Sequence, residues 1–212
     1  MKPPKEVAVL LNLTGERVIP EMMDPMNGML LEHLARYYFA MEYAKGRVLD
    51  ISCGTGYGSK IIAKARKAFL DEIIAVDNHE ETLQYAKAKH YHPLIQYLKM
   101  DAEDPKLPGT LGQFDLIISF ETIEHLAREK TFTDNLYHML KPGGTLILST
   151  PFGAGRGQPT NEKFHVHQLT EKEFIDLFDD YSEKAFYYQR SVLVEPKREG
   201  KRYPFGIAVC KK

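Results

Sequence analysis

The amino-acid sequence predicts an α/β fold with a doubly wound, mostly parallel sheet. Three observations support this fold class. Five short apolar runs, each suited to one strand, alternate with segments of helical periodicity. A glycine-rich turn joins the first of these runs to a helical segment. Acidic residues directly follow several of the runs, at the edge where such sheets bind ligands.

The composition is typical of a globular protein with no general attraction for charged partners. The chain has 212 residues, and we expect one domain over 1–212. The formal net charge of −1 does not favour nucleic acid or an anionic membrane as a partner. Only Cys53 and Cys210 are cysteines, and the apolar run 7–11 is too short for a signal peptide, so we expect a cytoplasmic location. No stretch approaches the length of a membrane span.

The first strand, 48–51, leads into a turn that contains Gly54, Gly56 and Gly58, and a helical pattern follows. This order indicates a nucleotide site, because glycines let the backbone approach a ligand and the helix offers unpaired N–H groups. A dinucleotide-binding loop, G-x-G-x-x-G, would place a pyrophosphate at the helix N-terminus. Asp50 at the end of the strand would repel that pyrophosphate and favours a ligand with positive charge.

The remaining elements are expected in alternation along the chain. Helices are predicted over 29–44, where Gly46 would end the helix, and over 80–90 and 131–140. Strands are predicted over 72–77, 95–100, 114–120 and 145–150.

Two stretches rich in aromatic residues, 183–194 and 203–210, predict two further strands. The basic segment 195–202 would join them. We interpret it as a solvated turn, with contact to a phosphate as the alternative.

Four acidic residues, Asp50, Asp77, Asp101 and Glu121, each lie at the end of a predicted strand or directly after it. Because the carboxyl ends of parallel strands meet at one edge, we expect these side chains to converge there. Asp77 ends the second strand of a βαβ unit, where a carboxylate can accept both hydroxyls of a ribose. The alternative is that Asp77 or Asn78 caps the next helix.

The segment from Asp50 to Gly58 and the turn 141–144, Lys-Pro-Gly-Gly, resemble the class I S-adenosylmethionine-dependent methyltransferases. The resemblance implies a seven-stranded Rossmann-like sheet with an antiparallel last strand, and a helical cap over 1–45 on a core over 46–212. It implies S-adenosylmethionine as the cofactor and S-adenosylhomocysteine as the product. Asp101 would receive the adenine amino group and the N–H of Ala102 would bond the ring, although a turn-capping role for Asp101 is the alternative.

A second resemblance lies in Thr14-Gly-Glu-Arg17 and in His33-x-x-Arg36-Tyr37, which are similar to a subgroup of bacterial small-molecule methyltransferases. It implies that Arg17, Arg36 and Tyr37 face the methionine end of the cofactor, with core packing as the alternative for Tyr37. Residues 14–20 are interpreted either as a surface loop or as a lid over the cofactor. The full expected cofactor-binding set is Arg17, Tyr37, Asp50, Ser52, Gly54, Gly56, Asp77, Asn78, Asp101, Ala102 and Phe120.

The candidate catalytic residues are Glu121, Glu124, His125 and His165. On a helical turn, the first three would share one face, where they could act as a base or bind a divalent metal. The long glycine-containing loop 151–168 would bring His165, or alternatively His167, towards them.

The Glu-x-x-Glu-His element with a later histidine resembles the terminal 2′-O-methyltransferases of small RNA. That resemblance implies that Glu121, Glu124, His125 and His165 ligate a metal. It stops at Phe152, where that family has an asparagine after Ser-Thr-Pro. Glu-His at this place also resembles metal-free small-molecule O-methyltransferases, so we assign no metal.

We therefore predict an S-adenosylmethionine-dependent methyltransferase that acts on a small-molecule or sugar-containing metabolite. It would work as a monomer or homodimer, without nucleic acid or a membrane as partner. One alternative is metal-dependent 2′-O-methylation of RNA termini. Another is a non-catalytic S-adenosylmethionine-binding module, and an NAD-linked oxidoreductase is disfavoured by Asp50.

Overall fold

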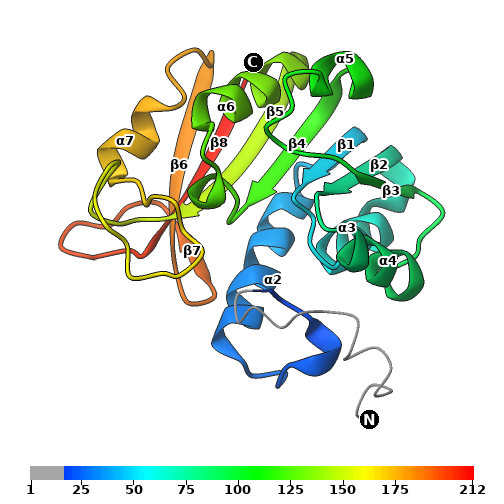
Figure 1. Ribbon diagram of the computed structural model, residues 1–212, viewed down its shortest axis with the longest axis horizontal. Coiled ribbons are helices and arrows are strands. Elements are labelled where there is room, and N and C mark those ends of the chain that lie inside the picture. The colour runs from blue at the N-terminus through cyan, green and yellow to red at the C-terminus, as the bar shows by residue number, and fades with distance from the viewer. Residues whose placement is uncertain (1–16) are drawn as a thin grey trace.

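The computed structural model describes residues 17–212, so that Thr14, Gly15 and Glu16 of the N-terminal motif lie outside the described residues. An eight-stranded sheet has the order β3-β2-β1-β4-β5-β8-β6-β7 (Figure 1). The strands are β1 (Gly46–Ile51), β2 (Leu70–Asp77), β3 (Ile95–Lys99), β4 (Phe114–Phe120), β5 (Leu140–Pro151), β6 (Glu183–Arg190), β7 (Leu193–Glu195) and β8 (Phe205–Lys211).

The pairing confirms the predicted fold class. The five strands β3, β2, β1, β4 and β5 are parallel neighbours, and β8 pairs antiparallel with β5 and with β6. The α-helices are α2 (Gly28–Met41), α3 (Tyr57–Arg66), α4 (Glu80–Lys89), α5 (Leu107–Leu111), α6 (Glu129–Met139) and α7 (Glu171–Asp176). Short 3₁₀ helices are η1 (Pro20–Met22), η2 (Lys67–Phe69) and η3 (Ile123–His125).

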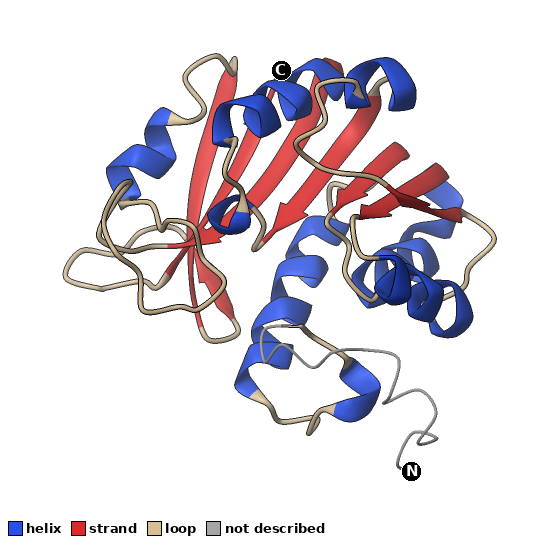
Figure 2. Ribbon diagram, viewed as in Figure 1, coloured by secondary structure: helices blue, strands red, loops and turns tan. Residues whose placement is uncertain are grey.

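Helices pack on the two faces of the sheet (Figure 2). Adjacent strand residues point to opposite faces, and so Val48 packs with α2 and α3 while Leu49 packs with α5, α6 and α7. Because both faces are buried, β1, β2, β4 and β5 read as nearly continuous apolar runs in the sequence.

Two expected boundaries are wrong. Gly46 does not end the N-terminal helix, which stops at Met41; it begins β1 with a φ of 60°, and a side chain there would meet the carboxylate of Asp115. The stretch 183–194 is not one strand. Ser191, at a φ of 52°, turns it into a hairpin of β6 and β7, which adds an eighth strand to the seven expected.

Among residues 17–212, no helix is long and apolar enough to cross a membrane. Cys53 and Cys210 are both buried and form no disulfide with each other.

Candidate active site

A cavity of about 570 Å³ opens at the carboxyl ends of β1, β2, β4 and β5. Helix α2 lines one side of it, and the loop after β5 lines another. Of the expected site residues, the cavity is lined by Arg17, Tyr37, Ser52, Gly54, Asp77, Asn78, Asp101, Ala102, Phe120, Glu121, Glu124, His125 and His165. Asp50 and Gly56 do not line it.

The glycine loop follows β1 in a series of left-handed residues. Ser52, Gly54 and Gly56 have φ values of 62°, 55° and 77°. A side chain on Gly54 would project into open space, whereas one on Gly56 would collide with the ring of Tyr97. Position 54 therefore favours glycine because of its left-handed backbone angle. Position 56 requires glycine also because Tyr97 packs against it.

Asp50 lies beneath the cavity wall, contrary to the expectation that it faces the ligand. Its carboxylate is 1% exposed and accepts hydrogen bonds from Ser59 Oγ at 2.5 Å and from Tyr37 Oη at 3.3 Å. Tyr37 reaches it because its ring lies against Gly58, where any side chain would collide with that ring. Burial raises the pKa of Asp50 to about 7, even though the bonds from Ser59 and Tyr37 oppose the rise.

Asp77 lies at the end of β2 and holds the glycine loop. Its two oxygens accept backbone N–H groups of Gly54 and His79, each at 2.9 Å. The alternative, that Asp77 or Asn78 caps the next helix, is wrong, since His79 is the N-cap of α4 and its ring accepts from the N–H of Thr82. Each carboxylate oxygen of Asp77 keeps a second lone pair for a ligand in the cavity.

Asp101 and Ala102 follow β3 at the same edge of the sheet. Asp101 closes a local turn, in which Oδ1 accepts the N–H of Glu103 at 2.9 Å. The turn-capping alternative is therefore present in the structure. Asp101 also lines the cavity, and Arg128 lies 3.5 Å from its Oδ2. The side chain can thus serve the turn and a ligand together.

Arg36 is fully buried in α2, and its side chain reaches residues of β6 and β8. Its guanidinium donates to Gln189 at 2.8 Å, lies over the ring of Phe205, and is 4.0 Å from a carboxylate oxygen of Glu121. Glu121 in turn accepts from Ser149 Oγ at 2.8 Å. These contacts place Arg36 on the Glu121 side of the cavity.

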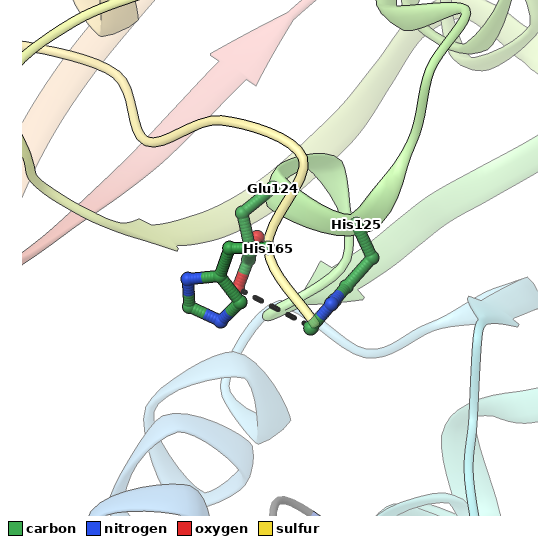
Figure 3. Close-up of side chains that lie close together, drawn as sticks. All are labelled: Glu124, His125 and His165. Carbon is green, nitrogen blue, oxygen red and sulfur yellow. Dashed lines mark ion pairs between the residues drawn. The ribbon is translucent and has the colours of Figure 1, made fainter. Parts of the chain in front are cut away.

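The expectation that Glu121 shares a helical face with Glu124 and His125 is wrong. It has a φ of 49°, and η3 begins only at Ile123. Glu124, His125 and His165 instead form the cluster, with one potential ligand atom from each all within 4.8 Å of one another (Figure 3). The rings of His125 and His165 are 4.8 Å apart in an edge-to-face arrangement.

Backbone contacts bring the loop after β5 to this cluster. The N–H of Val166 donates to the carbonyl oxygen of Glu124 at 2.8 Å, and Nδ1 of His125 lies 3.0 Å from the carbonyl oxygen of Phe164. The open choice between two histidines is thereby resolved. His165 lines the cavity, whereas His167 lies 3.2 Å from Glu129 outside it.

Burial changes the protonation of two groups around the cavity. Burial, and then the nearby Glu121, raise the pKa of Glu124 well above its usual value. Its Oε2 accepts from Thr150 at 3.1 Å, while its buried Oε1 has no hydrogen-bond partner. Burial and the Arg36 cation hold the pKa of His33 well below its usual value, so His33 is neutral. Such shifts often mark functional sites.

Sequence reasoning missed several residues that line the cavity. On α2, Met29 and Glu32 line it together with Arg36 and with His33, which the sequence had shown only as part of a motif and without a role in the site. Their helical spacing of three and four residues was the signal that could have found them. Gln168, whose Nε2 is 3.1 Å from His165, had no comparable signal, because only the folded loop brings it there.

This fold and site define a Rossmann-like protein that binds a nucleoside-containing cofactor at the carboxyl edge of its sheet. Residues 49–148 match the model of a methyltransferase domain family. A probable S-adenosylmethionine-dependent methyltransferase of Mycolicibacterium smegmatis is 31% identical over 80% of this chain and 64% of its own. Residues 49–148 therefore belong to this methyltransferase domain family, and the chain is a relative of S-adenosylmethionine-dependent methyltransferases.

Another relative is similar in sequence, and a solved structure is similar in fold. The malonyl-[acyl-carrier protein] O-methyltransferase of Priestia megaterium is 29% identical over 91% of this chain and 67% of its own. The N-methyltransferase NodS of Bradyrhizobium japonicum, solved with S-adenosylhomocysteine, shares the fold at a TM-score of 0.66 and 17% identity, covering 98% of this chain and 97% of its own. The chain spans 64% and 61% of the length of the mycobacterial relatives it matches.

Proposed function

We propose that this protein transfers the methyl group of S-adenosylmethionine to a small-molecule or sugar-containing metabolite in the cytoplasm. A single observation carries the proposal. One cavity brings the strand-end acids Asp77 and Asp101 together with Glu121, Glu124 and the histidines. The strand-end acids suit a nucleoside, whereas the two glutamates and the histidines suit the acceptor and its proton.

The chemistry of the cavity walls fits the proposed cofactor. Asp77 offers free lone pairs to ribose hydroxyls, and Gly54 leaves open space beside it. Asp101 and Ala102 both line the cavity, and we propose that the Asp101 carboxylate and the backbone N–H of Ala102 bind the adenine ring. When bound, S-adenosylmethionine supplies an electrophilic methyl group on a sulfonium. Asp50 lies behind Tyr37, and we propose that it acts on the cation through its field.

On the acceptor side, the residues of this chain would orient the nucleophile and remove its proton. His125 and His165 are partly exposed to the cavity, and imidazole is the side chain best suited to a proton transfer near neutral pH. Relatives named as O-methyltransferases, such as the ubiquinone biosynthesis enzyme of Nitrobacter winogradskyi at 33% identity over 49% of this chain, support an oxygen acceptor.

Binding of the product provides the direct test. We expect calorimetry to show S-adenosylhomocysteine binding with one site and a Kd on the order of 1–100 μM, a range that corresponds to roughly 5–8 kcal/mol. No binding at millimolar ligand would contradict the proposal. A thermal-shift panel with nicotinamide dinucleotides serves as the control, and stabilisation by these ligands alone would favour an oxidoreductase instead. Retained product binding without turnover of any acceptor would favour a non-catalytic module.

One observation favours a second candidate, metal-assisted 2′-O-methylation of RNA termini. Glu124, His125 and His165 offer three potential ligand atoms, and the unpartnered oxygen of Glu124 lies among them. This candidate predicts that Mn²⁺ raises the melting temperature of the wild type and that the effect is lost in His125→Ala and His165→Ala. His138→Ala, which changes an exposed histidine of α6, should respond like the wild type.

The same shift in all three variants, or activity that survives EDTA unchanged, would remove this candidate. The formal net charge of −1 also gives it no general electrostatic support.

We further propose that residues 1–212 act as one domain, with 1–45 as a cap, in a monomer or homodimer.

A further inference from the structure

The segment Arg17–Met23, called here the covering segment, lies across part of the cavity rim. Arg17 and Val18 line the cavity, and Val18 and Ile19 are 5% and 1% exposed. Thr55 Oγ1 of the glycine loop donates to the carbonyl oxygen of Val18 at 2.9 Å. Ile19 packs on Tyr85 of α4. The covering segment therefore contacts both the cofactor loop and α4.

Glu21 connects this segment to α4 through both of its oxygens. Oε1 is 2.8 Å from Nε2 of His90, and Oε2 accepts from Tyr85 Oη at 2.9 Å. The side chain of His90 is 5% exposed, and its Nδ1 is 2.5 Å from the carbonyl oxygen of Thr55. His90 therefore lies between the covering segment and the glycine loop.

Both ring nitrogens of His90 face oxygen acceptors. A carbonyl oxygen only accepts, and so does an ionised carboxylate, so the ring of His90 bridges two acceptor oxygens. Burial raises the pKa of Glu21, but its own backbone N–H, Tyr85 and His90 together lower it below the usual value. Glu21 is consequently ionised at neutral pH, and the two side chains form an ion pair.

We propose that Glu21 and His90 are positioning residues, which hold the covering segment on the glycine loop and thereby set the affinity for the cofactor. The inference rests on the proposed function, because it names what the cavity binds. Neither Glu21 nor His90 lines the cavity, and the ion pair acts through Thr55 and Val18. It is a charge-assisted contact on a largely buried histidine, so its loss leaves an unpaired buried group.

Removing the pair should loosen the covering segment. We expect Glu21→Gln and His90→Gln each to weaken S-adenosylhomocysteine binding by about tenfold, mainly through faster dissociation. The double variant should be no weaker than either single variant, because the two residues form one contact. Turnover at saturating cofactor should stay near wild type, and Glu21→Asp should restore part of the affinity. Glu42→Gln, an exposed carboxylate change at the end of α2, is the matched control.

A second readout does not depend on cofactor binding. Trypsin cleaves after Arg17, and cleavage there, followed by mass spectrometry without any ligand, should be about tenfold faster in Glu21→Gln than in wild type or Glu42→Gln. Wild-type affinity in both single variants, additive losses in the double variant, or an equal loss in Glu42→Gln would overturn the inference. If wild type binds no S-adenosylhomocysteine, the proposed function fails, and the cleavage rates still decide whether Glu21 holds the segment.

Discussion

Asp77→Ala is expected to weaken S-adenosylhomocysteine binding by roughly 100-fold or more. The carboxylate would lose two hydrogen bonds to ribose hydroxyls, each worth about 1.5–3 kcal/mol for a charged partner. It would also release the N–H of Gly54, which it holds at 2.9 Å beside the cavity. Calorimetry on both proteins measures the effect.

The control for this substitution lies on the same strand. Asp71→Ala removes an exposed carboxylate near the start of β2, at the opposite end from the cavity, and should leave the affinity unchanged. Asp77→Asn keeps an oxygen acceptor and should fall between the two. An affinity for Asp77→Ala within twofold of wild type would show that this carboxylate does not bind the ligand.

Asp50→Asn is expected to stabilise the ligand-free protein at pH 8. Burial raises the pKa of Asp50 from 3.8 to about 7, so the folded state binds this proton more tightly than the unfolded state. The stability contribution therefore falls as pH rises from about 4 to about 7 and stays lost above that. A pKa shift of this size corresponds to about 4 kcal/mol of stability lost at pH 8, and asparagine avoids this loss because it does not ionise. A gain of about 1–4 kcal/mol would raise the melting temperature by several degrees.

The direction of the stability change distinguishes this effect from the destabilisation that most substitutions cause. Asp115 is the matched control, because Lys141 and the backbone N–H of Arg47 lower its pKa despite its partial burial. Asp115→Asn should lower the melting temperature at pH 8. Melting curves at pH 5 and pH 8 should show the Asp50→Asn gain shrinking at the lower pH. A loss of stability at pH 8, or a gain independent of pH, would contradict the assigned protonation.

Binding should change in the opposite direction to stability. The negative field of Asp50 favours the cationic methionine end of the proposed cofactor, so Asp50→Asn is expected to bind S-adenosylmethionine, which carries the sulfonium, less tightly. A buried carboxylate that destabilises the free protein but aids binding is a known compromise at functional sites. Unchanged affinity would leave Asp50 as a purely structural group.

Local patterns in the sequence were sufficient for the order of the elements. The runs that became β1, β2, β3, β4 and β5 are apolar because both faces of the sheet are covered, and this makes them visible without any structure. The acids after them were found for the same reason. A residue that follows a buried parallel strand must emerge at the carboxyl edge, whatever the rest of the chain does.

Contacts between distant segments could not be predicted in this way. Asp50 was expected in the cavity, but Tyr37 covers it, and that contact depends on the packing of α2 against Gly58. Glu121 was expected on a helical face with Glu124, but its positive φ directs it to Ser149 and Arg36. No periodicity in the sequence encodes either arrangement.

By itself, the sequence determined the α/β class, the strand order along the chain, the glycine loop and the acids at the strand ends. Periodicity and composition report burial, and burial is a local property of each segment. Only the tertiary structure decided that His165 rather than His167 joins Glu124 and His125, and that Glu21 meets His90. These contacts join residues far apart in the chain, and their geometry depends on how helices and loops pack on the finished sheet.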